Sequence, residues 1–162
     1  TNTYAKTKYF AEKEALKINS SILRTNFFGK SKNKKRLSFS DWIYKSLRSK
    51  QKINLADDVL FSPLSISSLC KLIFLVLKKK NNGIYNIGSK NGFSKYEFGI
   101  KLAKKLNLDT TLIEKVSYND INFYAKRNKD MRMVLKKFES KFQYKFKSLD
   151  AEINKVISDY KK

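Results

Sequence analysis

The chain has 162 residues, 41% of them hydrophobic and 14% aromatic, which is enough for one domain with a buried core. Its formal net charge is +22, but only five of its 36 basic residues are arginine, and its lysines are spread along the whole sequence. This pattern indicates a compositional bias rather than selection for phosphate contacts, so we do not expect a nucleic-acid partner. The absence of histidine excludes histidine-based triads and histidine metal sites, and a single cysteine excludes tetrahedral zinc; we expect no metal site.

Cysteine content and hydropathy also bear on location. One cysteine cannot form an intrachain disulfide, which fits a reducing, cytoplasmic environment. The longest apolar stretch, residues 66–77, is too short to cross a bilayer, so no membrane partner is expected.

Helices and short strands alternate along the chain, which predicts an α/β fold. Capping residues and apolar spacing predict helices at 3–17, 39–47, 65–80, 95–106 and 149–160. Runs rich in β-branched and aromatic residues predict strands at 21–28, 52–55, 84–88 and 110–116. No repeat or linker divides the sequence.

The first predicted helix carries Tyr4 and Lys8, which lie one turn apart on the same face. Burying an ammonium without a partner is costly, so this lysine is better explained if it faces a ligand and the phenol beside it. A nearby positive charge lowers the pKa of a phenol, which would make Tyr4 a usable general acid. Tyr9 and Lys13 have the same spacing, so spacing alone does not choose between the pairs.

Further short segments follow this helix in a fixed order. They are Leu23-Arg24-Thr25, Phe28-Gly29, Phe61-Ser62-Pro63-Leu64, the run Gly-Ile-Tyr-Asn-Ile-Gly at 83–88, the run Ser-Lys-Tyr-Glu-Phe at 94–98, and Lys136-Lys137-Phe138. With Tyr4, Lys8 and Glu12, they resemble the C-terminal half of an extended short-chain dehydrogenase/reductase of the dTDP-4-dehydrorhamnose reductase type. The resemblance covers nearly the whole chain. It selects Tyr4 and Lys8, because only that pair places Glu12 and Arg24-Thr25 where the family has them.

The resemblance implies a particular α/β architecture. The C-terminal half of a Rossmann-type NAD(P)-binding domain would be intertwined with a small α/β substrate-binding domain. Residues 1–30 would be the last catalytic helix and strand of a truncated Rossmann domain. Residues 31–162 would form mainly the substrate-binding part, with residues 60–90 returning to the Rossmann sheet.

The resemblance also implies roles for individual residues. Tyr4 would protonate the oxygen of a 4-keto sugar, and Lys8 would hold the nicotinamide ribose. The cofactor would contact Tyr4, Lys8, Thr25, Asn26 and Phe27, and the nucleotide sugar would contact Asn26, Trp42 and Arg127. Trp42 is equally compatible with a core position, and Arg127 with a solvated charge. Asn128 stands where the family usually has a proline, which weakens the assignment of Arg127.

A glycine-rich turn for the pyrophosphate of NADPH or NADH is absent, since the five glycines are scattered at 29, 83, 88, 92 and 99. We therefore expect the chain to be the C-terminal portion of a longer enzyme, inactive without its N-terminal Rossmann half. The resemblance leaves a homodimer open.

The function that the resemblance implies is NAD(P)-dependent reduction of a nucleotide-linked 4-keto-6-deoxy sugar for cell-surface polysaccharide or O-antigen synthesis. Three alternatives stay open at this point. They are a nucleotide-sugar epimerase or dehydratase of the same family, a basic nucleic-acid-binding module, and a non-catalytic remnant of the reductase fold.

Overall fold

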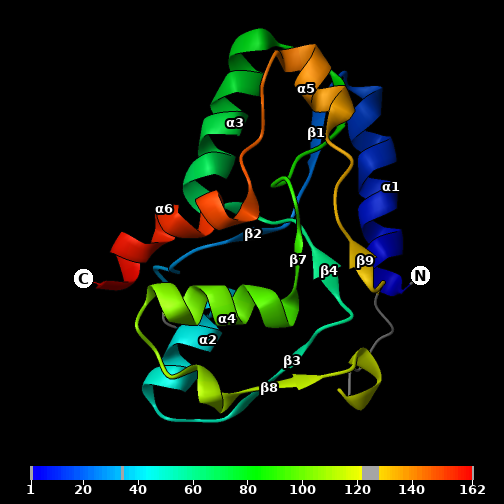
Figure 1. The fold of residues 1–162 in the computed structure, drawn as a ribbon. Coiled ribbons are helices and arrows are strands. Elements are labelled where there is room, and N and C mark those ends of the chain that lie inside the picture. The colour runs from blue at the N-terminus through cyan, green and yellow to red at the C-terminus, as the bar shows by residue number, and fades with distance from the viewer. Residues whose placement is uncertain (1, 34, 122–127, 162) are drawn as a thin grey trace.

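The computed structural model describes residues 2–33, 35–121 and 128–161 and has an α/β fold (Figure 1). The helices are α1 (Thr3–Lys17), α2 (Phe39–Arg48), α3 (Ile66–Lys79), α4 (Lys95–Lys105), α5 (Lys136–Phe142) and α6 (Leu149–Lys161). The strands are β1 (Ser21–Arg24), β2 (Phe27–Phe28), β3 (Ile53–Ala56), β4 (Leu60–Phe61), β5 (Leu64–Ser65), β6 (Gly83–Asn86), β7 (Phe93–Ser94), β8 (Ile113–Val116) and β9 (Asp130–Met131). Two 3-10 turns, Thr110–Leu112 and Tyr118–Asp120, flank β8.

The predicted helices are confirmed to within two residues, largely because serine caps mark where they begin. Ser38 and Ser94 form capping boxes at α2 and α4, and the Ser65 side chain accepts a hydrogen bond from the backbone of Ser68 at α3. The prediction of one strand over residues 21–28 is wrong. The chain leaves the ladder at Thr25 and Asn26, because the next two residues pair with β5 instead of continuing beside β6.

Parallel pairing dominates the small sheets. β1 lies parallel to β6 in the register Ser21↔Gly83 to Arg24↔Asn86, and β3 lies parallel to β8. β2 is parallel to β5, while β4 lies between antiparallel β7 and parallel β9. Parallel strands need long crossovers, and the helices supply them.

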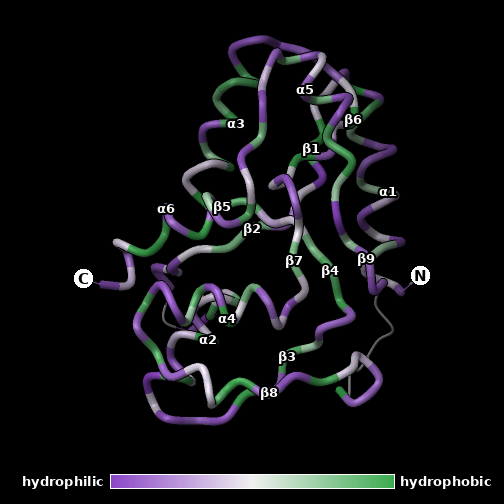
Figure 2. Tube along the Cα trace, viewed as in Figure 1, coloured by the Kyte–Doolittle hydropathy of each residue, from purple (hydrophilic) through white to green (hydrophobic). Residues whose placement is uncertain are grey.

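Two apolar clusters form the core. The larger one lies among α2, α4, α6, β3 and β8 and includes Phe98, Leu102 and Ile153, all fully buried. The smaller one joins α3, α5 and β6, where Phe138 stacks on Phe142 with ring centroids 4.3 Å apart. Figure 2 shows hydrophobic and polar positions interleaved along α3, α4 and α6.

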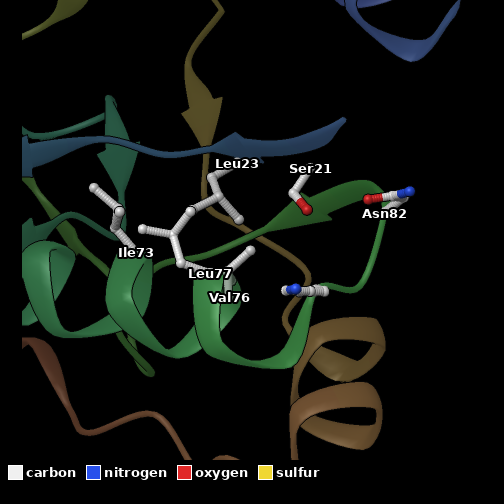
Figure 3. A pocket seen from close by; sticks show the side chains of 7 residues that line it. Ser21, Leu23, Ile73, Val76, Leu77 and Asn82 are labelled. Atoms are coloured by element: carbon white, nitrogen blue, oxygen red, sulfur yellow. The ribbon is translucent and has the colours of Figure 1, made fainter. Parts of the chain in front are cut away.

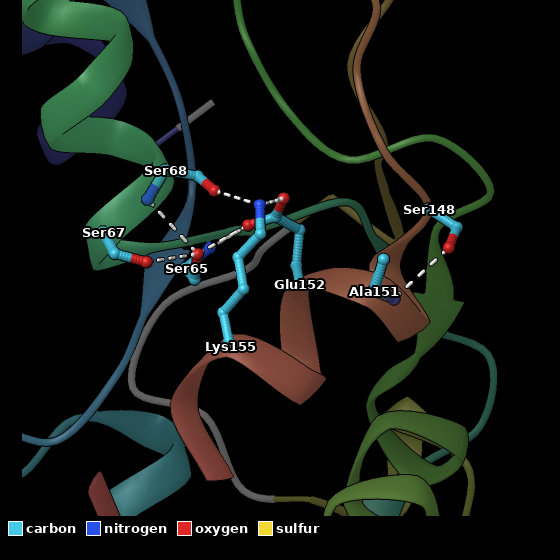
Figure 4. Close-up of polar contacts among 7 residues, drawn as sticks. All are labelled: Ser65, Ser67, Ser68, Ser148, Ala151, Glu152 and Lys155. Carbon is cyan, nitrogen blue, oxygen red and sulfur yellow. Dashed lines mark hydrogen bonds and ion pairs between the residues drawn. The ribbon is translucent and has the colours of Figure 1, made fainter. Parts of the chain in front are cut away.

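A buried carboxylate connects α6, in the larger apolar cluster, to the start of α3, in the smaller one. Glu152 of α6 accepts hydrogen bonds from the Ser65 backbone nitrogen at 3.0 Å and from the Ser65 hydroxyl at 2.6 Å, at the start of α3 (Figure 4). Lys155 donates to Glu152 at 2.6 Å and to the Ser68 hydroxyl at 2.6 Å. Burial alone would raise the pKa of Glu152, but the hydrogen bonds from Lys155, Ser65 and Ser68 outweigh it and hold the pKa below its ordinary value.

We expect Glu152→Gln to lower the free energy of unfolding by about 1.5–3 kcal/mol, because hydrogen bonds to a buried charged group are lost. A carboxyl group whose pKa is lower in the folded state stabilises the protein at pH values above its unfolded-state pKa. This contribution is lost as the pH falls through the folded-state pKa. The difference from the parent protein should therefore be full at pH 7 and shrink below about pH 4. Urea unfolding of the parent and the variant, at pH 7 and below about pH 4, measures this difference.

The matched control is Glu14→Gln. Glu14 also pairs with a lysine three residues on, but both side chains are more than two-thirds exposed, so the change should cost well under 1 kcal/mol. Equal effects of the two substitutions would contradict a structural role for the Glu152 contacts.

Candidate active site

Helix α1 lies almost entirely on the surface. Asn2 caps it by accepting a hydrogen bond from the Ala5 backbone nitrogen at 3.0 Å. None of its residues is buried, and only Glu12 and Ala15 are partly covered. The helix runs beside β1 in Figure 1, and the short turn after it makes the two elements antiparallel. Its position therefore depends on few contacts.

The strongest of these contacts is an ion pair. The Arg24 guanidinium, at the end of β1, donates from Nε to Glu12 Oε1 at 2.8 Å and from Nη2 to the other carboxylate oxygen. These hydrogen bonds lower the pKa of Glu12 despite some desolvation, and they raise the pKa of Arg24. A bidentate pair fixes both the height and the rotation of the helix on the strand.

The rotation decides which tyrosine–lysine pair faces the strand. With 3.6 residues per turn, Lys8 lies within about 40° of both Glu12 and Ala15, and Tyr4 lies within about 20° of Ala15. Lys13 is at least about 100° from both, whereas Tyr9 lies about 60° from Glu12 and about 120° from Ala15. The positions of the two lysines favour the pair of Tyr4 and Lys8.

The two side chains of the chosen pair lie close together. Lys8 Nζ is 5.8 Å from the centroid of the Tyr4 ring, within cation–π range. Tyr4 is 70% exposed, so its hydroxyl is accessible to a ligand. The Tyr9–Lys13 pair makes the same contact at 4.8 Å, and so the side-chain contact alone does not identify the site.

Helix rise places the pair beyond the carboxyl end of β1. Lys8 precedes Glu12 by four residues, about 6 Å along the helix, which corresponds to about two residues of strand past Arg24. That position is level with Asn26. In open parallel α/β sheets, ligands bind outside the carboxyl ends of the strands.

The segment after β1 is shaped by contacts with distant parts of the chain. The Asn26 carbonyl accepts a hydrogen bond from the Leu64 backbone nitrogen at 2.9 Å, and its side chain donates to the Met131 carbonyl at 3.4 Å. The Thr25 hydroxyl donates to the Asn26 carbonyl at 3.0 Å. Phe27 is 59% exposed, although its neighbour Phe28 is buried. Met131 was not among the predicted site residues, because no local sequence signal connects positions 105 residues apart.

Of the other two predicted pocket residues, Trp42 is in the described part of the chain. Trp42 lies on α2, whose main packing partners are α4 and β3, and its ring stacks on Phe39 at 6.0 Å. At 38% exposure, Trp42 is an exposed member of that aromatic pair. Arg127 lies outside the described residues.

The described residues fit only one end of NAD(P)H. Tyr4, Lys8 and the segment Thr25 to Phe27 offer a phenol, an ammonium and polar backbone at a strand end, which suit a ribose and a nicotinamide. The glycine-rich pyrophosphate cradle is not in the sequence. Among the described residues, no cluster of three or more acidic, cysteine or histidine side chains could hold a metal ion. None of the described helices is long and apolar enough to cross a membrane.

Solved structures share this fold. The dTDP-4-dehydrorhamnose reductase from Bacillus anthracis, in complex with NADP, is 19% identical with a TM-score of 0.88, over 98% of this chain and 56% of its own. The Clostridium acetobutylicum ortholog of that reductase is 17% identical with a TM-score of 0.78, over 88% and 49%. The dTDP-glucose 4,6-dehydratase from Bacillus anthracis, in complex with NAD, is 19% identical with a TM-score of 0.78, over 99% and 52%.

These likenesses show a Rossmann-type α/β fold. The family model of the RmlD substrate binding domain matches residues 1–162, so the chain belongs to that family. It spans about half the length of the solved structures it resembles. A comparison with curated proteins gives no match.

We expect Arg24→Gln to loosen α1 without unfolding the protein. The pair is partly exposed, so the global cost should stay below about 1 kcal/mol. A helix of 15 residues with no buried side chain is marginal by itself, so its amide hydrogens should exchange several-fold faster. Hydrogen exchange followed by NMR measures this. Unchanged exchange in α1 would show that other contacts hold the helix.

Proposed function

We propose that this chain is the catalytic and substrate-binding part of an NAD(P)-dependent reductase of a nucleotide-linked 4-keto-6-deoxy sugar, in the synthesis of a cell-surface polysaccharide. The single observation that carries the proposal is the bidentate Glu12–Arg24 pair, which holds α1, with Tyr4 and Lys8, against the end of β1. The family match and the reductase structures of the same fold support it.

The residues have distinct roles in this proposal. NADPH or NADH supplies the hydride. The Tyr4 hydroxyl holds the proton that passes to the oxygen of the sugar carbonyl. The Lys8 ammonium orients a ribose and favours the charge that develops on the phenol oxygen. The nicotinamide and the sugar contact Thr25, Asn26 and Phe27.

The proposal assigns two parts to the chain. Residues 1–30 belong with the nucleotide-binding sheet, and residues 60–90 return to it, which the parallel β1–β6 ladder supports. The remainder, mainly within 31–162, forms the substrate-binding part, which includes Trp42 and Arg127. A complementary polypeptide segment carries the glycine-rich turn. The single cysteine supports a reducing, cytoplasmic setting.

We expect Tyr4→Phe, in the enzyme reassembled with a glycine-rich nucleotide-binding half, to lower kcat about 10²- to 10⁴-fold, because a general acid is lost. Stability should not change, since the ring is exposed. The measurement is NADPH oxidation with a dTDP-4-keto-6-deoxy sugar.

Tyr9→Phe is a matched control for this experiment. Tyr9 is 50% exposed and has the same lysine contact, but it lies on the other side of α1. It should leave kcat unchanged. Equal loss in both variants, or no loss in Tyr4→Phe, would remove Tyr4 from the reaction and favour a non-catalytic role.

We expect the 162-residue chain alone to bind NADPH no more tightly than the millimolar range, because it lacks a pyrophosphate cradle. Isothermal titration measures this. A micromolar affinity would mean that the described residues form a complete cofactor site.

A nucleotide-sugar dehydratase or epimerase is the second candidate, favoured by the likeness to dTDP-glucose 4,6-dehydratase. The same reassembled enzyme separates the candidates. A reductase consumes NADPH with its substrate, whereas a dehydratase or epimerase converts the sugar without net cofactor use.

A further inference from the structure

The cavities of the described structure differ in how their polar walls are satisfied. A cavity of about 680 Å³ between β1 and α3 has mainly apolar walls, formed by Leu23, Ile73, Val76 and Leu77 (Figure 3). Its serine, Ser21, donates its hydroxyl to the Asn81 carbonyl at 2.7 Å. Among the described residues there, no buried polar side chain lacks a partner, so nothing in this cavity calls for a polar ligand.

A second cavity, of about 560 Å³, is different. It lies where the loop after β6, residues 88–92, meets the end of β4 and the segment from β9 to α5. Ser89 lines it and is only 2% exposed, and its hydroxyl is the one buried polar side-chain atom without a hydrogen-bond partner in the described part of the chain. Leaving a buried hydroxyl unpaired costs free energy, so a partner from outside the chain would be stabilising.

The backbone on both sides of Ser89 is fixed. The Ser89 nitrogen donates to the Ser62 carbonyl at 2.9 Å, and Lys90 makes two backbone hydrogen bonds, of 2.8 and 3.0 Å, to the segment 147–149. A Cβ at Gly88 would lie 2.6 Å from the Ser62 carbonyl oxygen, so the glycine allows the loop to lie directly against the end of β4. The Ser89 hydroxyl is therefore held at the cavity wall and cannot find a partner by movement of its own loop.

The charged groups of the wall leave one cation unpaired. Arg132 donates to Asp130 from Nε at 2.9 Å and from Nη2 at 2.6 Å. Glu139 pairs with Lys90 at 3.5 Å. The ammonium of Lys136, at the start of α5, has neither kind of partner within the described ranges. The cavity thus offers a hydroxyl and an ammonium, which both donate hydrogen bonds, and no acceptor is left for them.

These two unmatched groups suit an oxyanion. A phosphate group accepts several hydrogen bonds and supplies the negative charge that Lys136 lacks. A water molecule could satisfy the hydroxyl alone, but it would leave the ammonium without a counter-charge and would fill only about 30 Å³. The volume of about 560 Å³ lies in the usual range for small-molecule sites. Val134, which is 76% exposed, lines the same cavity and offers apolar contact to the body of a larger ligand.

We propose that this cavity binds the phosphate group of a small molecule through the Ser89 hydroxyl and the Lys136 ammonium. Its lining residues do not include Tyr4, Lys8 or residues 25–27, so the inference goes beyond the proposed reductase site. Free phosphate and a phosphate monoester share this chemistry, and the cavity has room for either.

The test titrates the isotope-labelled chain with sodium phosphate, and in a second series with phenyl phosphate, followed by NMR. We expect the amide signals of Ser89 and Gly92 to shift along saturable curves. Tighter binding of phenyl phosphate would assign a phosphate monoester to the cavity, and equal binding would assign free phosphate. The ionic strength is kept constant, because a net charge of +22 attracts anions to the whole surface.

Three variants locate the site. Lys136→Gln should weaken phosphate binding about fivefold or more, because a charge-assisted hydrogen bond is lost. Lys137→Gln is the matched control, since it removes the same charge from an exposed neighbour that does not line the cavity, and it should leave binding unchanged. Ser89→Ala should weaken binding too. Without phosphate it should not lower the midpoint of thermal unfolding, because the hydroxyl has no partner to lose.

Three binding results would overturn the proposal. They are shifts that stay linear and spread over the lysine-bearing surface, equal weakening by Lys136→Gln and Lys137→Gln, and unchanged binding by Ser89→Ala. A lower unfolding midpoint of Ser89→Ala without phosphate would also contradict it, because the hydroxyl would then already have a partner in the protein. No nicotinamide cofactor or nucleotide sugar is present, so the outcome is independent of the reductase assay.

Discussion

The bidentate pair between Glu12 and Arg24 determines how α1 is oriented on β1. The helix buries none of its own residues, so its orientation is not set by a packed apolar stripe. Instead, a carboxylate on the helix and a guanidinium at the end of β1 fix its rotation and height. By helical spacing, that rotation turns Lys8 toward the strand and Lys13 away from it. The catalytic assignment therefore depends on a polar contact rather than on the core.

The rest of the described structure provides a platform for that strand end. Helix α6 connects the other elements of this platform. Near its start, Glu152 bonds to the first turn of α3. Near its end, the Tyr160 hydroxyl donates to Asp41 at 2.9 Å and contacts the Ser40 hydroxyl at 2.9 Å, and burial raises the pKa of Tyr160. Ser40 also accepts from the Gly29 nitrogen, just after β2. The segment from Thr25 to Gly29 is thus held by contacts from residues far along the chain.

The sequence predicted local structure well and long-range structure poorly. Ser38, Ser65 and Ser94 are capping residues whose effect is local, and the helices they begin were predicted correctly. The break at Thr25 and Asn26 was missed, because it depends on pairing with β5 about forty residues later. The spacing of Tyr4 and Lys8 was visible, but the rotation that selects them required a contact with β1. Trp42 could be read as a pocket or a core residue, and its stacking on Phe39 followed only from the folded helix.

The most direct test of the central claim is a crystal structure of the chain reassembled with a nucleotide-binding half, NADP⁺ and a nucleotide-sugar ligand. The account predicts that the Tyr4 hydroxyl lies within about 2.6–3.2 Å of the reacting sugar oxygen. It also predicts Lys8 at the nicotinamide ribose and the Glu12–Arg24 pair intact. A cofactor bound on the other face of α1, near Tyr9 and Lys13, would contradict it.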